Sequence, residues 1–593
     1  WRADPEAAYR AKVEELLARA QFGERWGRHW LDVARFAESS GKELNMTYPQ
    51  AWRYRDYVID SFNEDKPYNR FVQEQVAGDL LPAKSDEQWQ ENLIATGFLA
   101  IGTKGLNERN VRQFALDVAD EQIDTTTQAI LGLTVSCARC HDHKSDPIPT
   151  ADYYALSGIF QSTRTYYGTL NLAVSRRGSK LLEAPVADEV PVKTFSPREL
   201  ERIRERLTEA EAELREAGRG GGANNVIRLR SVVTGLRAQL NGVDENGRAK
   251  TFLMGVQDHP DPVEARVLVR GELDKPAQEV ARGFLQVLEG EQPTTLPSDA
   301  SGRLELARWM SAESNPLTAR VMVNRVWQHL FGRGIVPTTS NFGASGQEPS
   351  HPELLDHLAL EFMEDGWSVK SLIRKLVTSS SYRQASTYRV AAFTSDPENS
   401  LLWRFTPRRL DAEALRDSLL AVSGQLDLER PLGSMVAEAG DAPVGIRLRP
   451  EMLNRPVSYR SVYLPVVRDA LPESLALVDP SDPTIVTGTR ESTNVPGQAL
   501  NQMNNPYVNR QPEEQANPLL RQEDNSRDRL RRAFELCFGR LATDAELRGA
   551  GVFLQRFRET AGETIEEDQR VNFLALSSFC QGLLASAEFR YLN

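Results

Sequence analysis

The spacing of apolar residues predicts helices throughout residues 1–165. Glu6–Ala20 has a helical composition, and between about Gly23 and Glu38 apolar residues recur every three or four positions. Tyr54–Phe62 and Tyr68–Val76 predict shorter helices. The same spacing then continues over five positions: Ile123, Thr126, Ile130, Leu133 and Cys137. We therefore expect a helical N-terminal domain over residues 1–165.

The middle of the chain changes its pattern three times. Residues 166–198 lose periodicity and gain proline and polar residues, which predicts an extended linker. Two amphipathic stretches in residues 199–245, separated by a glycine-rich run, predict a helical hairpin. Residues 246–298 contain the β-rich run Arg266–Gly271 followed by turn residues, so we expect a small β module there.

Residues 299–593 return to helical periodicity and form the last predicted domain. The predicted helices are Leu304–Trp309, Ala319–Phe331, Pro352–Met363, Val369–Leu376, Asp411–Val422, Ser526–Cys537 and Val571–Ala585. Residues 433–509 are rich in proline, asparagine and aspartate, which predicts long ordered loops with short strands. The predicted fold is mainly α and multi-domain, with a large helical C-terminal domain that carries long loops.

Composition narrows the possible functions. The net charge of -12 argues against a general nucleic-acid binder. No apolar run approaches the roughly 18 residues that span a bilayer, so we expect no membrane span. The sequence starts at Trp1, with neither an initiator methionine nor a signal peptide. We therefore expect a processed start or a longer parent protein.

The most informative motif is Cys137-Ala138-Arg139-Cys140-His141. Cys-x-x-Cys-His is the attachment signature of a c-type haem, in which both thiols bond to the haem vinyl groups and the histidine becomes the proximal iron ligand. The spacing would place both sulfurs and the imidazole on the core-facing side of one helix. We therefore expect one covalent haem c, bound by Cys137, Cys140 and His141, in the N-terminal domain.

Three other interpretations of the cysteine pair stay open. A zinc site with His141 or His143 lacks a second ligand pair nearby, because the next histidine is His259 and the next cysteine is Cys537. A thioredoxin-like redox pair would follow a strand, whereas helical spacing precedes this pair. Two structural thiols would leave the adjoining histidine unexplained.

The sixth iron position separates electron transfer from catalysis. His29 is the leading candidate, because it lies between two tryptophans on an apolar helical face where an unpaired imidazole is costly. A core histidine bonded to a backbone carbonyl is the alternative. Met46 is a further candidate, whereas His143 is expected to point away from the iron. We expect a six-coordinate, low-spin iron with His141 proximal and His29 distal.

The C-terminal half contains weaker candidates. A possible metal group is His351, Glu353, Asp356 and His357, although Ser350 and Glu353 have the spacing of a helix capping box. A possible sugar-binding cluster, or equally a buried polar network, is Asn324, Arg325, Trp327 and His329. Cys537 and Cys580 lie in apolar helical stretches and either form a disulfide or remain buried thiols.

Two parts of the chain resemble known families. The stretches Glu24–Arg35, Leu131–Lys144, Asp146–Pro149 and Asp152–Leu156 resemble the planctomycete-specific cytochrome c domain. The second half resembles the domain of unknown function that usually follows it, in Asn315–Trp327, Asn341–Gly343, Pro349–Leu355 and Arg408–Glu413. The resemblance implies a secreted protein with a haem-bearing N-terminal domain, and it implies no substrate.

The expected function is that of a secreted c-type cytochrome that transfers electrons through one covalent haem to a redox partner protein. Covalent haem is attached outside the cytoplasmic membrane, so a periplasmic or extracellular location follows. A haem-dependent peroxidase or oxidoreductase acting on a small molecule or glycan is one alternative. A structural or assembly protein is another, with the hairpin as a possible homo-oligomer contact.

Overall fold

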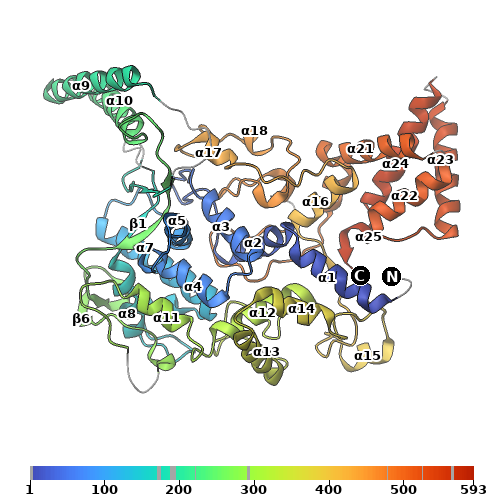
Figure 1. Cartoon of the computed structure of the whole chain (residues 1–593), viewed down its shortest axis with the longest axis horizontal. Helices are drawn as coiled ribbons and strands as arrows, with labels where there is room; N and C mark the ends of the chain where they lie inside the picture. Colours follow the sequence, from blue (N-terminus) through green and yellow to red (C-terminus); the bar gives the residue numbers. More distant parts are fainter. Residues whose placement is uncertain are drawn as a thin grey trace.

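The computed structural model describes residues 4–169, 175–186, 195–220, 222–289, 294–476, 478–523, 525–562 and 567–592. Helices dominate this part of the chain, and its strands form only two-stranded antiparallel sheets (Figure 1). The predicted mainly α, multi-domain fold class is therefore confirmed. No described helix is long and apolar enough to cross a membrane.

The N-terminal segment contains most of the helices expected from its apolar spacing. They are α1 (Pro5–Ala18), α2 (Gln21–Val33), α3 (Trp52–Asn63), α4 (Tyr68–Ala77) and the end of α7 (Val111–Thr126). Helices α5 (Asp86–Ala95), α6 (Gly97–Ala100) and α8 (Thr150–Gln161) were not predicted. The predicted helix around α2 extended to Glu38, but Arg35 has a φ of 44°. Left-handed backbone cannot continue a right-handed helix, so α2 ends earlier.

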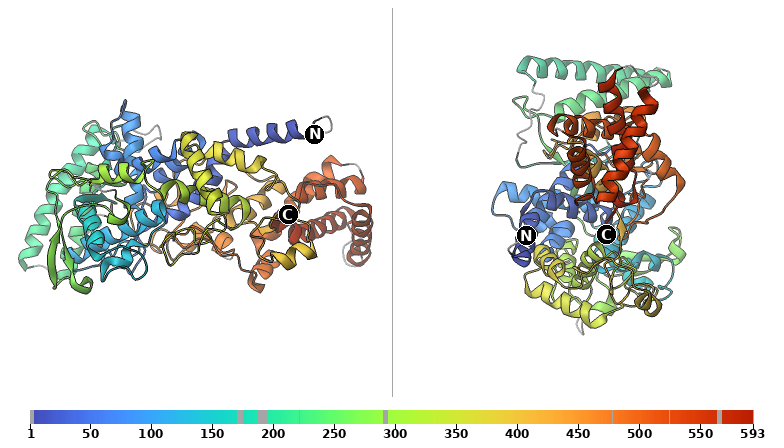
Figure 2. Two further views of the ribbon diagram at one scale, coloured as in Figure 1. Left: turned by 90° about the horizontal axis from the view of Figure 1, so that it is seen from below. Right: turned by 90° about the vertical axis from the view of Figure 1, so that its right-hand side faces the viewer.

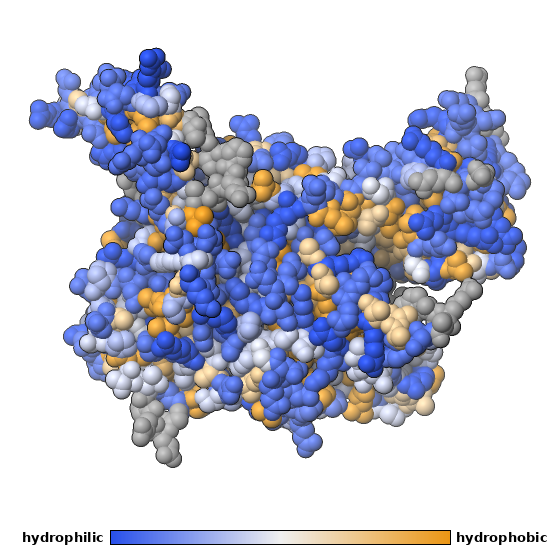
Figure 3. Space-filling model, viewed as in Figure 1, coloured by the Kyte–Doolittle hydropathy of each residue, from blue (hydrophilic) through white to orange (hydrophobic). Residues whose placement is uncertain are grey.

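The predicted helical hairpin is present. Helices α9 (Pro197–Gly220) and α10 (Ala223–Asn241) pack against each other, and Arg237 of α10 forms an ion pair of 2.6 Å with Glu211 of α9. The hairpin projects from the main body, as does the C-terminal helical bundle at the other end (Figures 1 and 2). The face shown in Figure 3 is predominantly hydrophilic over the hairpin. Parts of the predicted 166–198 linker lie outside the described residues.

The strands link segments that the sequence assigned to different domains. Strand β1 (Thr163–Tyr166) pairs with β4 (Gly255–Asp258), and β2 (Leu182–Glu183) pairs with β3 (Phe252–Leu253). Strands β5 (Ala265–Leu268) and β6 (Pro276–Val280) form a hairpin, and β7 (Arg408–Arg409) pairs with β8 (Tyr591–Leu592). Residues 246–298 therefore depend on neighbouring segments for half of their strand pairing.

The C-terminal helices agree with their predicted bounds to within three residues. They are α11 (Arg303–Met310), α12 (Thr318–Phe331), α13 (Pro352–Glu364), α14 (Val369–Thr378), α16 (Ala412–Val422), α22 (Ser526–Phe538) and α24 (Asp568–Leu584). Beyond the 433–509 range, the unpredicted C-terminal helices are α15 (Val390–Ser395), α21 (Pro506–Gln522), α23 (Asp544–Gly562) and α25 (Ala587–Arg590).

The prediction of short strands within residues 433–509 is wrong. The described part of this range contains the short helices α17 (Met435–Ala439), α18 (Pro450–Leu453), α19 (Glu473–Ala476) and α20 (Pro496–Asn504), and no strand. Helices α18 and α20 each begin at a proline, whose fixed φ suits the first helical turn. Two of these helices therefore begin at a proline, whereas prolines such as Pro443 and Pro465 lie in the predicted loops.

A single hydrophobic core joins the N-terminal helices to α11–α14. Tyr68 of α4 illustrates the junction, because its ring centroid lies 6.1 Å from that of Trp30, 6.2 Å from that of Phe362 and 6.5 Å from that of Trp367. Helices α21–α24 form smaller cores of their own. The two halves of the chain are therefore packed together, and sites can form between them.

Candidate functional site

The Cys-x-x-Cys-His motif lies in a short 3-10 turn, Val135–Arg139, and not on an α-helix. Helix α7 continues through one π-helical turn to Leu131 and stops at Gly132, whose φ is 63°. Both Cys137 and Cys140 are exposed. The predicted core-facing helix through the motif is therefore wrong, because the left-handed glycine interrupts the apolar periodicity.

Side chains of α7 and α8 form ion pairs and hydrogen bonds that stabilise the turn. Arg139 forms ion pairs of 2.9 Å with Asp120 and 3.3 Å with Asp117. The hydroxyl of buried Tyr153 donates to Asp120 at 2.7 Å, and that of buried Tyr154 donates to the Arg139 carbonyl at 3.1 Å. The backbone between the two cysteines is thus fixed while the thiols stay accessible.

His141 is exposed, and its own loop orients its ring. The Nδ1 atom lies 2.7 Å from the carbonyl oxygen of Asp142, so it carries the proton and donates. The carboxylate of Asp142 in turn accepts the backbone N–H of Thr150 at 2.8 Å, at the start of α8. A hydrogen bond at Nδ1 fixes the tautomer and leaves Nε2 as a basic nitrogen, which is the arrangement of a metal-binding histidine.

His143 has a structural role in the same loop, and its side chain is only 5% exposed. Its Nδ1 atom accepts the backbone N–H groups of Asp146 at 2.8 Å and Ser145 at 3.3 Å. The proton is therefore on Nε2, which lies 3.1 Å from the hydroxyl oxygen of Thr134. Both ring nitrogens are used within the protein.

Residues of the C-terminal half donate hydrogen bonds to the segments on both sides of the motif. The backbone N–H of Phe342 donates to the Gly132 carbonyl at 2.7 Å, and that of Ala344 donates to the Asp146 carboxylate at 2.6 Å. Arg325 of α12 donates to the carbonyls of Gln128 and Ala129 at the end of the π-helical turn. A cation at the carbonyl end of a helical segment also favours its dipole.

The loop between β5 and β6 approaches the Cys140 sulfur on one side. A Cβ atom at Gly271 would lie 3.0 Å from the Cys140 sulfur, and Gly271 has a φ of 71°. Glycine therefore lets this loop approach the cysteine closely.

Neither candidate for the sixth iron position lies at the motif. Half-buried His29 stacks on His329 of α12, with ring centroids 3.6 Å apart and planes 19° apart. Trp26 meets both rings edge-on. Met46 is fully buried and pairs through its backbone with Pro443. The structure does not bring His29 to His141, and it gives His29 an aromatic partner that the sequence did not suggest.

His29 and His329 face a cleft of about 360 Å³ between the two halves of the chain. Its walls come from α2, α12, residues 406–411, residues 478–492 and β8, and no residue of the Cys-x-x-Cys-His loop lines it. Burial and nearby guanidinium groups hold the pKa of His29 well below its usual value, and burial lowers the pKa of His329 to about 3. Both imidazoles are therefore neutral at pH 7.

Ion pairs tie the two halves of the chain together beside the histidines. Arg490 bridges Asp32 at 2.7 Å and Glu413 at 2.6 Å, and Asp32 also pairs with Arg28 at 2.5 Å. Arg25 pairs with Asp411 at 2.5 Å. These carboxylates are saturated by guanidinium groups and are not available as proton acceptors.

The predicted Asn324–His329 cluster separates into two roles. Asn324 is buried and exchanges hydrogen bonds with the backbone of Val336, and Trp327 stacks on Phe331 with ring centroids 4.0 Å apart. Asn324, Arg325 and Trp327 are buried and each contacts a different partner, and of the four residues only His329 lines the cleft.

The structure does not bring together the predicted metal group of His351, Glu353, Asp356 and His357. The N-cap of α13 is His351 and not Ser350, so the capping box is absent. His357 lies 3.2 Å from Glu361 on the surface. Among the described residues, no group of three or more His, Cys, Asp and Glu could hold a metal ion.

Cys537 and Cys580 are unpaired, as are the two motif cysteines. Cys580 is buried, and Cys537 accepts a hydrogen bond of 3.3 Å from the Gln515 amide. The alternative of unpaired thiols thus describes them better than a disulfide.

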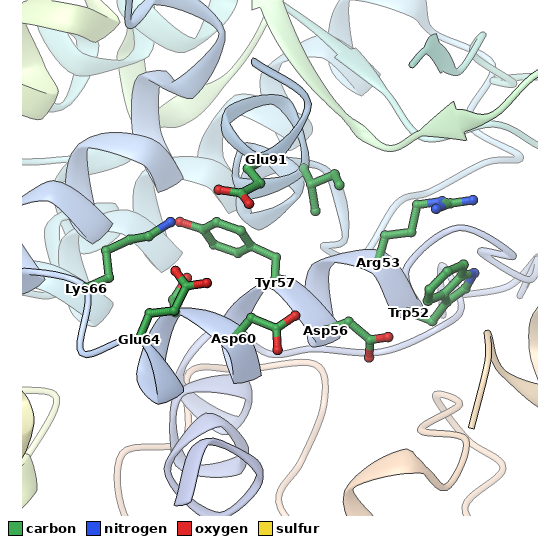
Figure 4. A pocket seen from close by; sticks show the side chains of 10 residues that line it. Trp52, Arg53, Asp56, Tyr57, Asp60, Glu64, Lys66 and Glu91 are labelled. Carbon is green, nitrogen blue, oxygen red and sulfur yellow. The ribbon is translucent and has the colours of Figure 1, made fainter. Parts of the chain in front are cut away.

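A second cavity, of about 160 Å³, lies between α3 and α5 (Figure 4). Glu91 of α5 lies opposite the carboxylates of α3, and burial raises its pKa. Most of the other charges already have partners, since Asp60 pairs with Arg430 at 2.5 Å and Lys66 with Glu74 at 2.8 Å. The hollow therefore lies beside existing ion pairs, and the Asp60–Arg430 pair is itself exposed to solvent.

Two family models match parts of the chain. Residues 1–165 match the family PSCyt2, described as a protein of unknown function (DUF1549), and residues 302–554 match PSD1, described as a protein of unknown function (DUF1553). Both domains are therefore present, and the motif and the cleft lie where they meet. No curated protein and no solved structure matches the chain.

Proposed function

We propose that this protein binds one haem c covalently through Cys137 and Cys140, with His141 as the proximal iron ligand, and transfers electrons outside the cytoplasmic membrane. The observation that carries the proposal is the exposed turn, in which two accessible thiols adjoin an imidazole whose Nε2 is free. The residues fit the attachment chemistry, because both of the thiols that would bond to the vinyl groups are exposed. When bound, the haem supplies a one-electron carrier.

The surrounding residues would position the group and limit its motion. The carbonyl of Asp142 orients the His141 ring, and the ion pairs of Arg139 keep the turn rigid. The loop at Gly271 lies against the Cys140 side and restricts one approach. A surface site of this kind leaves an edge open to a redox partner protein in the periplasm or outside the cell.

The placement of His29 changes the expected iron coordination. His29 is engaged with His329, and Met46 is buried elsewhere, so neither supplies a second protein ligand. An open sixth position is the feature that a haem-dependent peroxidase or oxidoreductase needs. This observation favours that class as the second candidate function.

Optical spectra of the protein, matured in a host that attaches haem c, test both candidates. We expect a redox-active haem spectrum that the Cys137→Ser/Cys140→Ser double variant loses and that the Cys537→Ser control keeps. Carbon monoxide should bind the reduced protein readily, and His29→Ala should not alter the spectrum. Equal haem in the double variant and the parent would contradict the attachment, and a low-spin spectrum lost in His29→Ala would restore His29 as the ligand.

A further inference from the structure

The cleft between α2 and α12 contains a half-buried cation, Arg408, that forms no ion pair with a carboxylate of the described residues. Arg408 donates to the carbonyl of His329, and burial lowers the pKa of its guanidinium. No carboxylate of the described residues lies within ion-pair distance of it, and Asp411 is already bonded to Arg25. A partly desolvated guanidinium whose contacts are a carbonyl and the ring of Phe405, 5.8 Å away, is only partly compensated, and an anion in the cleft would offset the remaining cost.

The two stacked imidazoles add unused hydrogen-bond donors to the same cleft. No ring nitrogen of His29 or His329 has a hydrogen-bond partner among the described residues, although both rings are half-buried. A neutral imidazole carries one N–H donor and one acceptor. The cleft is thus lined by two imidazoles, each with one N–H group, and by Arg408, the one lining guanidinium that forms no ion pair among the described residues.

We propose that this cleft is a binding site for a ligand that presents an oxyanion, and that Arg408, His29 and His329 contact it. The proposal is independent of the haem, because no residue of the Cys-x-x-Cys-His loop lines the cleft. A metal ion suits the cleft less well, since the neighbouring carboxylates Asp32 and Asp411 are both bonded to guanidinium groups.

The charges around the histidines make binding sensitive to pH. The groups that face the pair come from α2, residues 408–413 and residues 479–491: Arg25, Arg28, Asp32, Arg408, Arg409, Asp411, Glu413, Asp479, Arg490 and Glu491. Burial, the neighbouring His329 and the surrounding guanidinium groups disfavour protonation of His29. An oxyanion has the opposite effect, so it stabilises the imidazolium and is bound more tightly as the pH falls.

Isothermal titration calorimetry on the full chain tests the site. Inorganic sulfate, inorganic phosphate and acetate are titrated in separate experiments, and the binding of each is compared with that of chloride at equal ionic strength. We expect saturable binding of at least one oxyanion, with proton uptake at pH 6 that is smaller at pH 8. Arg408→Gln should weaken binding at least tenfold. The control is Arg333→Gln, because Arg333 follows α12 but is exposed and pairs with Glu398. Oxyanion binding no stronger than chloride binding, or unchanged in Arg408→Gln, would overturn the proposal.

Chemical modification provides a readout that needs no variant. Diethyl pyrocarbonate acylates neutral imidazoles, and mass spectrometry of peptides reports each histidine separately. The bound oxyanion should protect His29 and His329 by at least severalfold and leave exposed His141 unprotected. Equal modification of His29 and His329 with and without the oxyanion would place the anion elsewhere and overturn the site.

Discussion

Gly132 offers a direct test of how the C-terminal half holds the motif. Its φ of 63° ends the helical segment just before the cysteines, and an added Cβ would lie 2.9 Å from Cδ2 of Phe342 and 3.1 Å from Cγ2 of Val321. Left-handed backbone costs an alanine about 1–2 kcal/mol. Overpacking adds about 1–3 kcal/mol. We expect Gly132→Ala to lower the free energy of unfolding by about 2–5 kcal/mol.

Gly424→Ala separates the two costs. Gly424 has a φ of 71° after α16 but no atom within 4 Å of its added Cβ, so only the backbone cost of about 1–2 kcal/mol applies. Urea unfolding followed by circular dichroism measures both variants. Adding Phe342→Ala to Gly132→Ala should recover the steric part as a coupling energy. Equal losses in the two glycine variants, with no coupling to Phe342, would refute the tight contact between the two halves.

Three further predictions concern buried titratable groups. His143→Ala should lower the free energy of unfolding by about 1–3 kcal/mol and speed hydrogen exchange in the motif loop, because it leaves the Asp146 N–H without its acceptor. The control is His357→Ala, at an exposed histidine. Equal exchange rates in the two variants would contradict the structural role of His143. Burial raises the pKa of fully buried Glu38 to about 7, so the unfolded carboxyl loses its proton first as the pH rises, and the free energy of unfolding falls from pH 4.5 to 7. Thermal unfolding at several pH values should show that Glu38→Gln removes this pH dependence. A pH dependence that persists in the variant would assign it to another group. His329 has a pKa near 3 when folded, so the unfolded chain binds the extra proton and stability falls as the pH drops from 6.5 towards 3; His329→Gln should flatten this dependence, and an unchanged curve would rule out His329 as its source.

The sequence predicts most long helices, because amphipathic spacing reflects the packing that stabilises them. Helix α12 is an example, since Ala319–Phe331 was expected and Thr318–Phe331 is observed. The same reasoning failed at the motif, where the apolar periodicity runs through Gly132 while the backbone there turns left-handed. A glycine inside a periodic stretch was the available signal for that break.

The cleft could not be predicted from the sequence, because its walls are separated by hundreds of residues along the chain. His29 was singled out as a polar residue on an apolar face, and His329 as part of a polar cluster. Only the fold shows that these two rings stack on each other. The segments Glu24–Arg35 and Arg408–Glu413, which carry part of the family resemblance, both contribute residues to this cleft, and pairing such segments requires the tertiary structure.

The mass of the intact, denatured chain tests the central claim most directly. Protein matured in a host that attaches haem c should retain the mass of one haem after unfolding and extraction with acid and organic solvent, and Cys137→Ser/Cys140→Ser should not. A denatured parent chain whose mass equals that of the polypeptide alone would contradict covalent haem at this motif.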